Sequence, residues 1–463
     1  MTQTVQLPLW LFILIVVFAA VTALSHFLLP SVRWFFRRRL ERAVERLNKR
    51  LTRPIEPFKL ARRHDMIQRL IYDPEVSQEI VNYARSNGVP ENVAFQKARE
   101  YAREIVPRFS AFAYFSFGIR LARLLTNTVY RVETASSNES TFAALPRDAT
   151  VVFIMNHRSN MDYMLVTYLA ARSSALSYAV GEWARVWPLS TLIRSMGAYF
   201  IRRRSRGALY RKVLARYVQM ATTGGVTQAF YPEGGLSLTG ALQPPKVGLL
   251  SYVVEGFDPE GERDIIFVPV AINYDRILED RVLIAAGERR RFGARITVVV
   301  GFVLRKIWRR MRGRDTRFGT AAVTFGDPLS LRRTGADVPV SDLSEMLMDR
   351  IAQAMPVLTV PLIARVMLQA KGPLSEAELL AKVAATLEQM PLRNRVPKPD
   401  VLPDRVARAT ARLKKRGVIS EDAKGLQIAA GQEPVLAFYA NSIAHFPSED
   451  AAPAAQIAAT AGS

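Results

Sequence analysis

Short runs of β-branched and other apolar residues alternate with stretches of helical spacing from about residue 148 to about residue 335. The first run is ATVVFIM, and the later ones are VTQAFYP, IIFVPVAINY, RITVVVGFVL and AAVTFGDPLSL. A short apolar run bounded by turn residues is typical of a strand that is buried on both faces of a sheet. The alternation of such strands with helices predicts an α/β domain.

A different apolar run stands near the N-terminus. Leu7 to Leu29 contains no Asp, Glu, Lys or Arg, and the stretch RWFFRRRLER follows it. At the helical rise, these residues span roughly 34 Å, enough for a hydrocarbon core of about 30 Å. A signal peptide is the weaker alternative, because no basic residue precedes the run. We expect a membrane anchor over residues 1–32, and the basic residues after it place the body in the cytoplasm.

The remaining segments look mainly helical. Residues 33–140 are basic and amphipathic, and PENVAFQKAREYAREIVPRFSAFAYFSFGIRLARLLTNTVYRV forms one long helical pattern. Its apolar half, residues 109–129, is an alternative membrane span, but Arg120 and Arg123 favour a buried or interfacial helix. The full set of expected segments is the anchor 1–32, the basic helical region 33–140, the α/β domain 141–335, a mainly helical region 336–450 and a disordered tail 451–463.

The formal net charge of +23 predicts an anionic partner, which leaves nucleic acid, anionic lipid and phosphorylated substrates open. The basic stretch RKIWRRMRGRDTR, residues 305–317, suits either a solvated loop or a patch against anionic lipid. Near the C-terminus, a helical pattern, the helix DRVARATARLKKRGVI and the strand GLQIAA follow one another, as in a winged-helix DNA reader. The absence of cysteine excludes disulfides, thiolate metal sites and cysteine nucleophiles.

The stretch NHRSNMDYM directly follows the first predicted strand and contains His157 and Asp162. Residues five apart on one helix lie about 140° apart around its axis, so the two side chains would not meet there. They meet if His157 precedes a helix that Ser159 or Asn160 caps, which predicts a strand–turn–helix junction. Asp162 would then fix the tautomer of His157, which becomes a general base for a substrate hydroxyl. Taken alone, such a pair is more often structural.

Two further stretches suggest an anion site, and a third contains an unusual proline. GAYFIRRRSRG carries Arg202 and Arg203, which could clamp a phosphate or form a solvated basic edge. FYPEGGLSLTGALQPPKVG has a glycine turn after Glu233, with Ser237 and Lys246 as further donors. FVPVAINYDRI breaks a buried strand at Pro269, which indicates an edge strand, a bulge or the approach of a ligand.

Together and in this order, NHRSNMDYML, GAYFIRR, EGGLSLTG…QPPKVG and VPVAINYD resemble the four motifs of the bacterial membrane glycerol-3-phosphate 1-O-acyltransferases, within the glycerolipid acyltransferase superfamily that shares the HxxxxD motif. The resemblance covers residues 100–335 and extends weakly to FYANSIAHF, residues 438–446. It implies an acyltransferase-type mixed β-sheet flanked by helices. It also implies transfer of an acyl group from acyl-CoA or acyl-carrier protein to the sn-1 hydroxyl of glycerol 3-phosphate, giving lysophosphatidate.

The resemblance also assigns roles to residues. It implies His157 as the base and Asp162 as the residue that orients it, with no metal and no cofactor. The residues implied to bind substrate are Arg158, Ser159, Arg202, Arg203, Glu233, Gly234, Ser237, Lys246 and Pro269. The implied partners are glycerol 3-phosphate, an acyl thioester, anionic lipid of the inner membrane and, for one donor, acyl-carrier protein, but no nucleic acid.

The chain departs from the family at one place. Leu236 and Leu238 stand where the third motif of the family usually has arginines, and leucine cannot bind phosphate. Either the remaining basic residues suffice, or the acceptor is lysophosphatidate or another hydroxylated lipid. A membrane-tethered nucleic-acid-binding protein is the alternative from another class, but it leaves the four ordered motifs unexplained.

Overall fold

The computed structural model describes residues 8–134, 144–170, 174–181, 189–202, 207–289, 317–335 and 337–447. Two compact units divide the chain, Met1–Pro54 and Ile55–Ser463. The predicted strand RITVVVGFVL, the basic stretch 305–316, Arg203 and the tail 451–463 lie outside the described residues.

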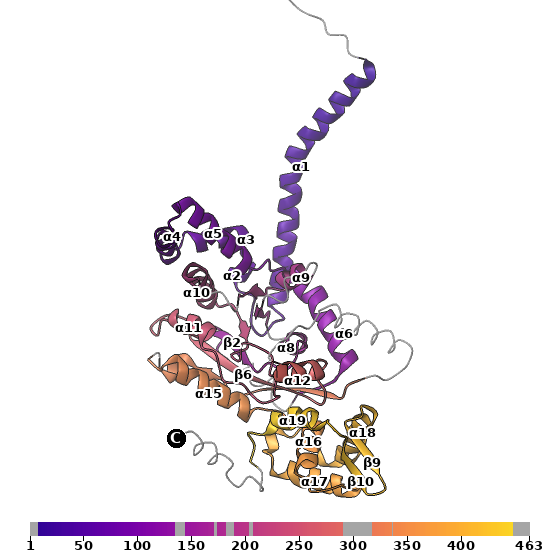
Figure 1. Cartoon of the computed structure of the whole chain (residues 1–463). Coiled ribbons are helices and arrows are strands. Elements are labelled where there is room, and N and C mark those ends of the chain that lie inside the picture. The colour runs from indigo at the N-terminus through magenta and orange to yellow at the C-terminus, as the bar shows by residue number, and fades with distance from the viewer. Residues whose placement is uncertain are drawn as a thin grey trace, which may run out of the picture. The chain divides into compact units, whose positions relative to one another are not determined.

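The first unit contains the helix α1 (Leu9–Asn48), which continues past the expected end of the anchor at residue 32 (Figure 1). The side chains of residues 19–37 lie outside the described set, so most of the predicted apolar span is not tested. Within the described residues, the helices lack the combination of length and apolarity that crossing a bilayer requires. The structure therefore gives no support to the expected anchor.

The second unit begins with short and medium helices, and the single long helix predicted after Pro90 is wrong. The elements are α2 (Pro57–Leu60), α3 (Arg63–Ile71), α4 (Pro74–Asn87), α5 (Glu91–Ile105), the π-helix η1 (Ala113–Gly118) and α6 (Ile119–Val129). α5 ends because Pro107 forces the preceding Val106 into an extended conformation, with ψ of 119°. The end of the predicted helix is instead the strand β1 (Arg131–Thr134).

The expected mixed sheet is confirmed. Among the described residues, the strands run in the order β1-β7-β6-β2-β5-β3-β4, and β8 pairs with β6. The strands after β1 are β2 (Thr150–Met155), β3 (Ser177–Val180), β4 (Tyr199–Phe200), β5 (Gln228–Phe230), β6 (Ile265–Tyr274), β7 (Thr320–Phe325) and β8 (Leu329–Ser330). β2 is parallel to both β5 and β6, whereas β7 and β8 are antiparallel to β6. Parallel neighbours bring the carboxyl ends of β2, β5 and β6 to one edge.

Pro269 lies in the middle of β6, a central strand, so the edge-strand interpretation is wrong. Its carbonyl accepts from the Gly326 N–H at 2.8 Å, which shows that this residue's backbone faces the β7 and β8 side. There β6 pairs with β7 from residue 270 onward and with β8 only up to residue 267. The missing N–H of the proline therefore falls in the gap between two short strands, where no ladder bond is lost.

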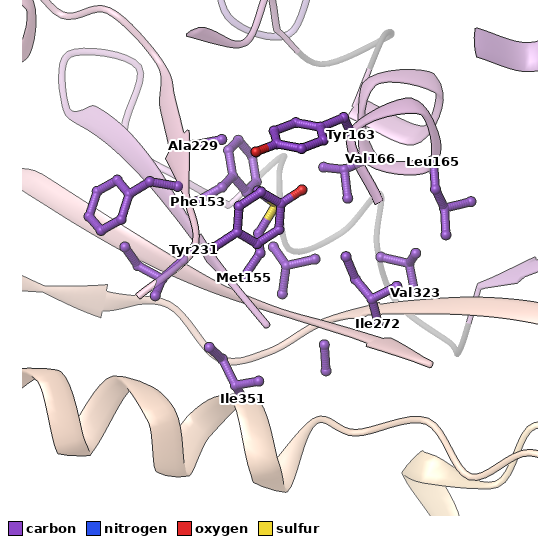
Figure 2. Close-up of a cluster of buried hydrophobic side chains, with 14 of the residues drawn as sticks. Phe153, Met155, Tyr163, Leu165, Val166, Ala229, Tyr231, Ile272, Val323 and Ile351 are labelled. Carbon is purple, nitrogen blue, oxygen red and sulfur yellow. The ribbon is translucent and has the colours of Figure 1, made fainter. Parts of the chain in front are cut away.

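Helices cover both faces of this sheet. The sheet-flanking helices are α8 (Asp162–Ala170), α9 (Leu189–Ser195), α10 (Ala208–Thr223), α11 (Gly248–Glu255), α12 (Asp280–Arg289), α14 (Leu331–Thr334) and α15 (Val340–Gln353). Figure 2 shows Ile351 of α15 below the strands and Leu165 and Val166 of α8 above them, with Phe153 and Ile272 between. All six residues of β2 are buried, as the first apolar run predicts.

The C-terminal region is mainly helical, as expected. It contains α16 (Thr359–Gln369), α17 (Glu376–Gln389), the 3-10 turns η3 (Leu392–Asn394) and η4 (Pro399–Val401), α18 (Leu402–Lys415), the hairpin β9 (Ile419–Asp422) and β10 (Gly425–Ile428), α19 (Glu433–Ala440) and η5 (Asn441–Ile443). The predicted order of two helices and a small wing is therefore present. α19 packs on α16 and α12, which brings the end of the chain to the α/β domain.

Candidate active site

The segment after β2 forms the strand–turn–helix junction that the sequence predicts. Asn156 fixes where the strand ends: its amide donates to the Ile272 carbonyl at 3.0 Å and its side-chain oxygen accepts from the Ile272 N–H at 2.7 Å. The turn closes when the Ser159 hydroxyl oxygen accepts from the Met161 N–H at 3.1 Å, and α8 begins at Asp162. The junction lies at the carboxyl edge of the parallel strands, where α/β proteins build sites.

His157 and Asp162 meet as expected. His157 Nδ1 lies 2.9 Å from Asp162 Oδ2, and both residues are at most 1% exposed. The same oxygen accepts the backbone N–H groups of Arg158 at 2.8 Å and Ser159 at 3.0 Å, and the Tyr274 hydroxyl donates to Oδ1 at 2.6 Å. A carboxylate with these donors can only accept from the imidazole, so Nδ1 carries the proton and Nε2 is the basic nitrogen.

Two tyrosines hold the plane of the imidazole. The Tyr231 ring stacks on His157 with centroids 3.9 Å apart and an angle of 17° between planes. Tyr163 meets His157 edge-on at 5.7 Å and Tyr231 edge-on at 5.0 Å. Figure 2 shows the Tyr163 and Tyr231 rings beside Met155 at the end of β2. These contacts leave the imidazole little freedom to rotate, which suits a base that must point at one hydroxyl.

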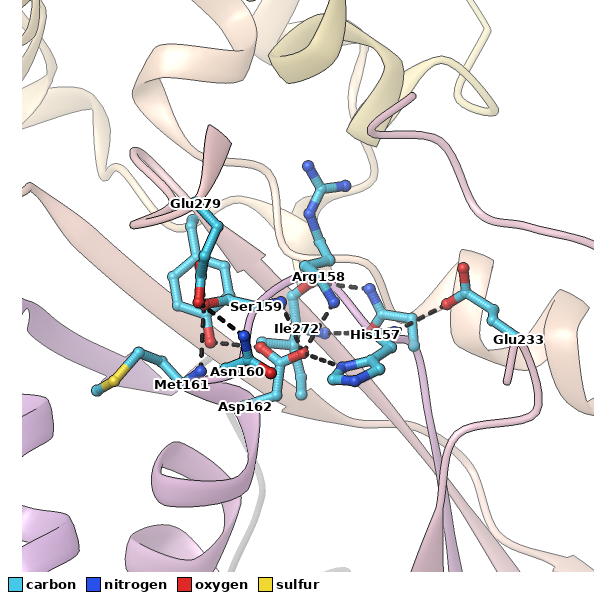
Figure 3. Close-up of polar contacts among 11 residues, drawn as sticks. His157, Arg158, Ser159, Asn160, Met161, Asp162, Glu233, Ile272 and Glu279 are labelled. Carbon is cyan, nitrogen blue, oxygen red and sulfur yellow. Dashed lines mark hydrogen bonds and ion pairs between the residues drawn. The ribbon is translucent and has the colours of Figure 1, made fainter. Parts of the chain in front are cut away.

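Glu233 holds the backbone of His157. One carboxylate oxygen accepts the His157 N–H at 2.8 Å (Figure 3). The other accepts the Gln243 N–H at 3.0 Å. Burial raises the pKa of Glu233 to about 7, although the two N–H donors and the Arg158 charge act in the opposite direction. The predicted role, ordering an arginine or a substrate hydroxyl, stays a prediction. The contacts in the structure tie the glycine turn to the loop that carries His157.

Ser159 and Asn160 contact Glu279 instead of an open site. The Ser159 hydroxyl donates to Glu279 at 2.9 Å and the Asn160 amide donates to it at 3.1 Å. Glu279 is buried, and burial raises the pKa of its carboxyl against the effect of these two donors. The contacts give Ser159 a part in shaping the loop, and its predicted contact with substrate stays a prediction.

Arg158 is a buried cation with unfilled donors. Its Nη1 donates to the Gly240 carbonyl, and Nε and Nη2 have no hydrogen-bond partner among the described residues. Figure 3 shows the guanidinium and the His157 imidazole extending on opposite sides of the loop. The guanidinium lies over the Phe438 ring of α19, 5.6 Å from its centroid, and burial lowers the pKa of the arginine.

The turn after Glu233 places a lysine beside it. Gly234 has a φ of +67°, and a Cβ there would lie 2.9 Å from the Lys246 side chain, so the stem of Lys246 crosses this glycine closely. Lys246 is exposed, and its amine forms no ion pair within the part of the chain that is described. The Ser237 hydroxyl donates to the Ala241 carbonyl at 2.7 Å and accepts from the Gly240 N–H at 3.0 Å, so it shapes the loop.

Two other predicted residues lie outside this network. The Arg202 guanidinium forms a two-pronged pair with Glu104 of α5, at 2.9 Å and 2.6 Å, and lies over the rings of Tyr101 and Tyr210. Pro269 lies within the sheet, paired in register with Ile154. Nothing in the described contacts brings either side chain to His157.

The C-terminal segment FYANSIAHF packs against the loops around the site. The Tyr439 hydroxyl donates to Asp280 at 2.6 Å, and the Asn441 amide donates to the Thr239 carbonyl at 2.9 Å. The Asn273 amide, at the end of β6, lies 3.2 Å from the Ser442 hydroxyl. The C-terminal region therefore supports the loops that carry the site.

Sequence reasoning missed several residues of the network, among them Tyr231, Tyr274 and Glu279. Tyr231 stands in the quoted stretch FYPEGG, two residues before Glu233, and Tyr274 stands in the fourth motif, so their closeness to the motifs was the available signal. Glu279 had no comparable signal, because only the fold brings it to Ser159. Among the described residues, no group of three or more His, Cys, Asp or Glu side chains could hold a metal ion.

Comparison with known families agrees with this geometry. Residues 138–273 match the family model described as Acyltransferase, and residues 304–461 match the one described as Glycerol-3-phosphate acyltransferase C-terminal region. Both confirm the resemblance predicted from the four motifs.

Similar curated proteins carry the name glycerol-3-phosphate acyltransferase. The chain is 26% identical to the one from Xylella fastidiosa strain M23, over 80% of this chain and 45% of that protein. It is 26% identical to the one from Alteromonas mediterranea, over 83% and 50%, and 28% identical to the one from Aeromonas hydrophila, over 84% and 50%. The chain thus spans about half the length of these relatives.

A crystal structure of the 1-acyl-sn-glycerophosphate acyltransferase from Thermotoga maritima is also similar. It covers 51% of this chain and 75% of its own, with 17% identity and a TM-score of 0.33, too low to add to the description of the fold.

Proposed function

We propose that this chain, which carries an acyltransferase domain followed by a C-terminal region of the glycerol-3-phosphate acyltransferase type, transfers an acyl group to glycerol 3-phosphate. The observation that carries the proposal is the contact of 2.9 Å between His157 Nδ1 and Asp162 Oδ2 at the end of β2. The donor is an acyl thioester of CoA or acyl-carrier protein, the acceptor is the sn-1 hydroxyl, and the product is lysophosphatidate.

In the proposed reaction, His157 Nε2 takes the proton of the acceptor hydroxyl as its oxygen attacks the thioester carbonyl. Asp162 stabilises the imidazolium that forms, because its carboxylate faces Nδ1. The tetrahedral oxyanion then collapses, the carbon–sulfur bond breaks, and the leaving thiolate takes the proton from Nε2. His157 returns to its neutral form, and no acyl-enzyme is formed.

We propose that Lys246 binds the phosphate of the acceptor. Its stem crosses Gly234, next to the carboxylate that holds the His157 backbone. Arg202 is engaged by Glu104, and Arg158 extends on the other side of the loop from the imidazole. Lys246→Ala is therefore expected to raise the KM for glycerol 3-phosphate more than the KM for the thioester, since an ammonium–phosphate contact contributes about tenfold in affinity.

Arg202→Ala tests the competing assignment from the second motif. If Arg202 binds the phosphate, this variant shows the larger rise in the acceptor KM, and Lys246→Ala leaves it unchanged. If the Glu104 pair is its whole role, Arg202→Ala lowers the melting temperature and changes both KM values alike. Measured side by side, the two variants decide between the lysine and the arginine.

The function itself is tested by incubating the purified chain with labelled palmitoyl-CoA and glycerol 3-phosphate. His157→Ala is expected to lower the turnover severely while the protein stays folded. The matched control is His64→Ala, which removes an exposed histidine from α3. Turnover in His157→Ala equal to that of the control would remove the basis of the proposal.

Leu236 and Leu238 bear on the choice of acceptor. Both are partly buried and pack against the core. Their aliphatic side chains carry no hydrogen-bond donor for a phosphate. A lysophosphatidate acceptor is therefore the second candidate, and product formed only from that acceptor would favour it.

We further propose that the domain works at the cytoplasmic face of the inner membrane. The support is a set of exposed apolar side chains, Phe112 just before η1, Phe117 in η1 and Leu124 in α6, with the exposed Arg120 and Arg123 also in α6. Apolar side chains flanked by arginines suit the interface of an anionic leaflet. A Phe112→Ser/Phe117→Ser variant should co-sediment less with vesicles that contain phosphatidylglycerol, and equal binding would argue against this surface.

A further inference from the structure

Arginines from three separate parts of the chain surround one cavity of about 90 Å³ at the edge of the sheet. This arginine pocket is lined by Arg131 of β1, Arg317 before β7, and Arg405, Arg408 and Arg412 of α18, with Asp275 among its other lining residues. A cavity of this size has room for a small polyatomic anion. None of these residues belongs to the four motifs that carry the acyltransferase chemistry except Asp275.

The pocket and the His157 site lie on different sides of β6. The Tyr274 hydroxyl donates to Asp162, whereas Asp275, the next residue, lines the arginine pocket. The ladder with β7 continues through Asp275, whose N–H donates to the Thr320 carbonyl at 2.9 Å. Consecutive side chains of a strand point to opposite faces, so the two sites are separate.

The charges in the pocket are only partly compensated. Arg405 pairs with Glu133 at 2.8 Å, and Arg408 pairs with Asp404 at 2.5 Å. Asp275 is buried, and its two oxygens accept the N–H groups of Thr320 at 2.8 Å and Val360 at 3.0 Å.

Arg131 and Arg412 have no carboxylate partner within the described residues. With the two ion pairs set aside, the cavity still gathers Arg131 and Arg412 around the single carboxyl of Asp275. Like charges gathered around one small cavity repel each other, and an anion between them removes this repulsion.

The type of basic residue in the pocket indicates the chemical class of the ligand. The pocket has arginine at all five basic positions and no lysine. A guanidinium offers several N–H donors in a planar fork, which matches the oxygens of a phosphoryl group or a carboxylate better than an ammonium does. A tetrahedral anion with three terminal oxygens can accept from several forks at once, whereas a planar carboxylate has only two oxygens to offer.

We propose that the arginine pocket binds a phosphoryl group, at a site distinct from the one that binds the acceptor of acyl transfer. The phosphoryl group belongs either to a soluble phosphate ester or to the headgroup of an anionic lipid, since both present the same oxygens to the arginines. Phosphoryl binding in the arginine pocket does not depend on the reaction at His157, so an experiment that disproves one of the two does not disprove the other.

The test measures binding of labelled inorganic phosphate to the full chain in neutral detergent, by equilibrium dialysis. The double variant Arg131→Ala/Arg412→Ala removes the two arginines that lack a carboxylate partner. It should weaken the site at least about tenfold, because each charge-assisted hydrogen bond contributes roughly that factor. Lys415→Ala removes one positive charge from the same helix without lining the pocket, and it should change binding less than about twofold.

Both mutated arginines are exposed, so the fold is expected to survive, and melting temperatures check this. Phosphate should raise the melting temperature of the wild type and of Lys415→Ala more than that of the double variant, because a ligand stabilises only the form that binds it. Phosphate that also occupies the acceptor site appears equally in both proteins, so the difference between them reports the pocket.

A second arm identifies the source of the phosphoryl group. Vesicles of phosphatidylcholine with and without phosphatidic acid replace the free phosphate. Binding that depends on phosphatidic acid and on the two arginines supports the proposal with a lipid source, and phosphate binding that depends on them supports it with a soluble source. The proposal is overturned if neither probe binds, or if the double variant binds both as well as the wild type does.

Discussion

Replacing Asp162 by asparagine keeps the size of the side chain and removes the charge that faces the His157 imidazole. The carboxylate now accepts from His157, from the N–H groups of Arg158 and Ser159, and from the Tyr274 hydroxyl. An amide oxygen in the place of Oδ2 can still accept the two backbone N–H groups. The amide nitrogen then faces the phenol oxygen of Tyr274, which can accept from it.

The loss in rate follows from the distance between the charges. When the imidazolium forms, a full negative charge 2.9 Å from Nδ1 stabilises it by about 6 kcal/mol at an effective dielectric constant of about 20. The amide dipole recovers part of this energy. We therefore expect kcat to fall about 10²- to 10⁴-fold, the range of a general base that loses its orienting group.

The assay is acyl transfer from labelled palmitoyl-CoA to glycerol 3-phosphate, with a melting curve for each protein. Asp264→Asn is the matched control, since Asp264 accepts from the N–H groups of Ile265 and Arg332 and from the Ser330 hydroxyl at the other end of β6. That variant loses a comparable set of bonds without touching His157. A kcat of Asp162→Asn within twofold of this control would refute the assignment of Asp162.

Three further outcomes are expected. Tyr274→Phe should lower kcat about ten- to hundredfold in the same assay, because it removes a charge-assisted hydrogen bond to Asp162. Gly240→Ala should destabilise the fold by about 3 kcal/mol in urea unfolding, since its φ is +84° and a Cβ would meet the Phe438 carbonyl. The pKa of the Glu233 carboxyl is about 7 in the folded chain and near 4.5 in the unfolded chain, so between these two pH values only the folded chain holds the proton. The contribution of Glu233 to the free energy of unfolding therefore falls as the pH rises from 4.5 to 7. Glu233→Gln should flatten the pH dependence of stability measured in this range.

The chemistry of the site was predictable where it is local in sequence. His157 and Asp162 are five residues apart, and the turn between β2 and the start of α8 brings them together, so spacing and a preceding strand predict the contact. The third motif was also recognisable, because the glycines at residues 234 and 235 follow Glu233 directly. What Glu233 contacts was not predictable, since its partner is the backbone N–H of a residue 76 positions away.

The predictions from the sequence failed where tertiary packing or a single proline determines the local structure. The pattern from Pro90 onward reads as one helix, but Pro107 ends it, and that signal stood in the sequence. Pro269 suggested an edge strand, yet β6 tolerates it because β7 and β8 leave a gap beside it. The Glu104 partner of Arg202 comes from a helix about a hundred residues earlier, which no local pattern indicates.

The most direct test offers the wild-type chain labelled acyl-CoA with glycerol 3-phosphate, and in parallel with lysophosphatidate. The account predicts that glycerol 3-phosphate yields lysophosphatidate, and that His157→Ala abolishes this product. Product formed only from lysophosphatidate, or from neither acceptor, would contradict the account.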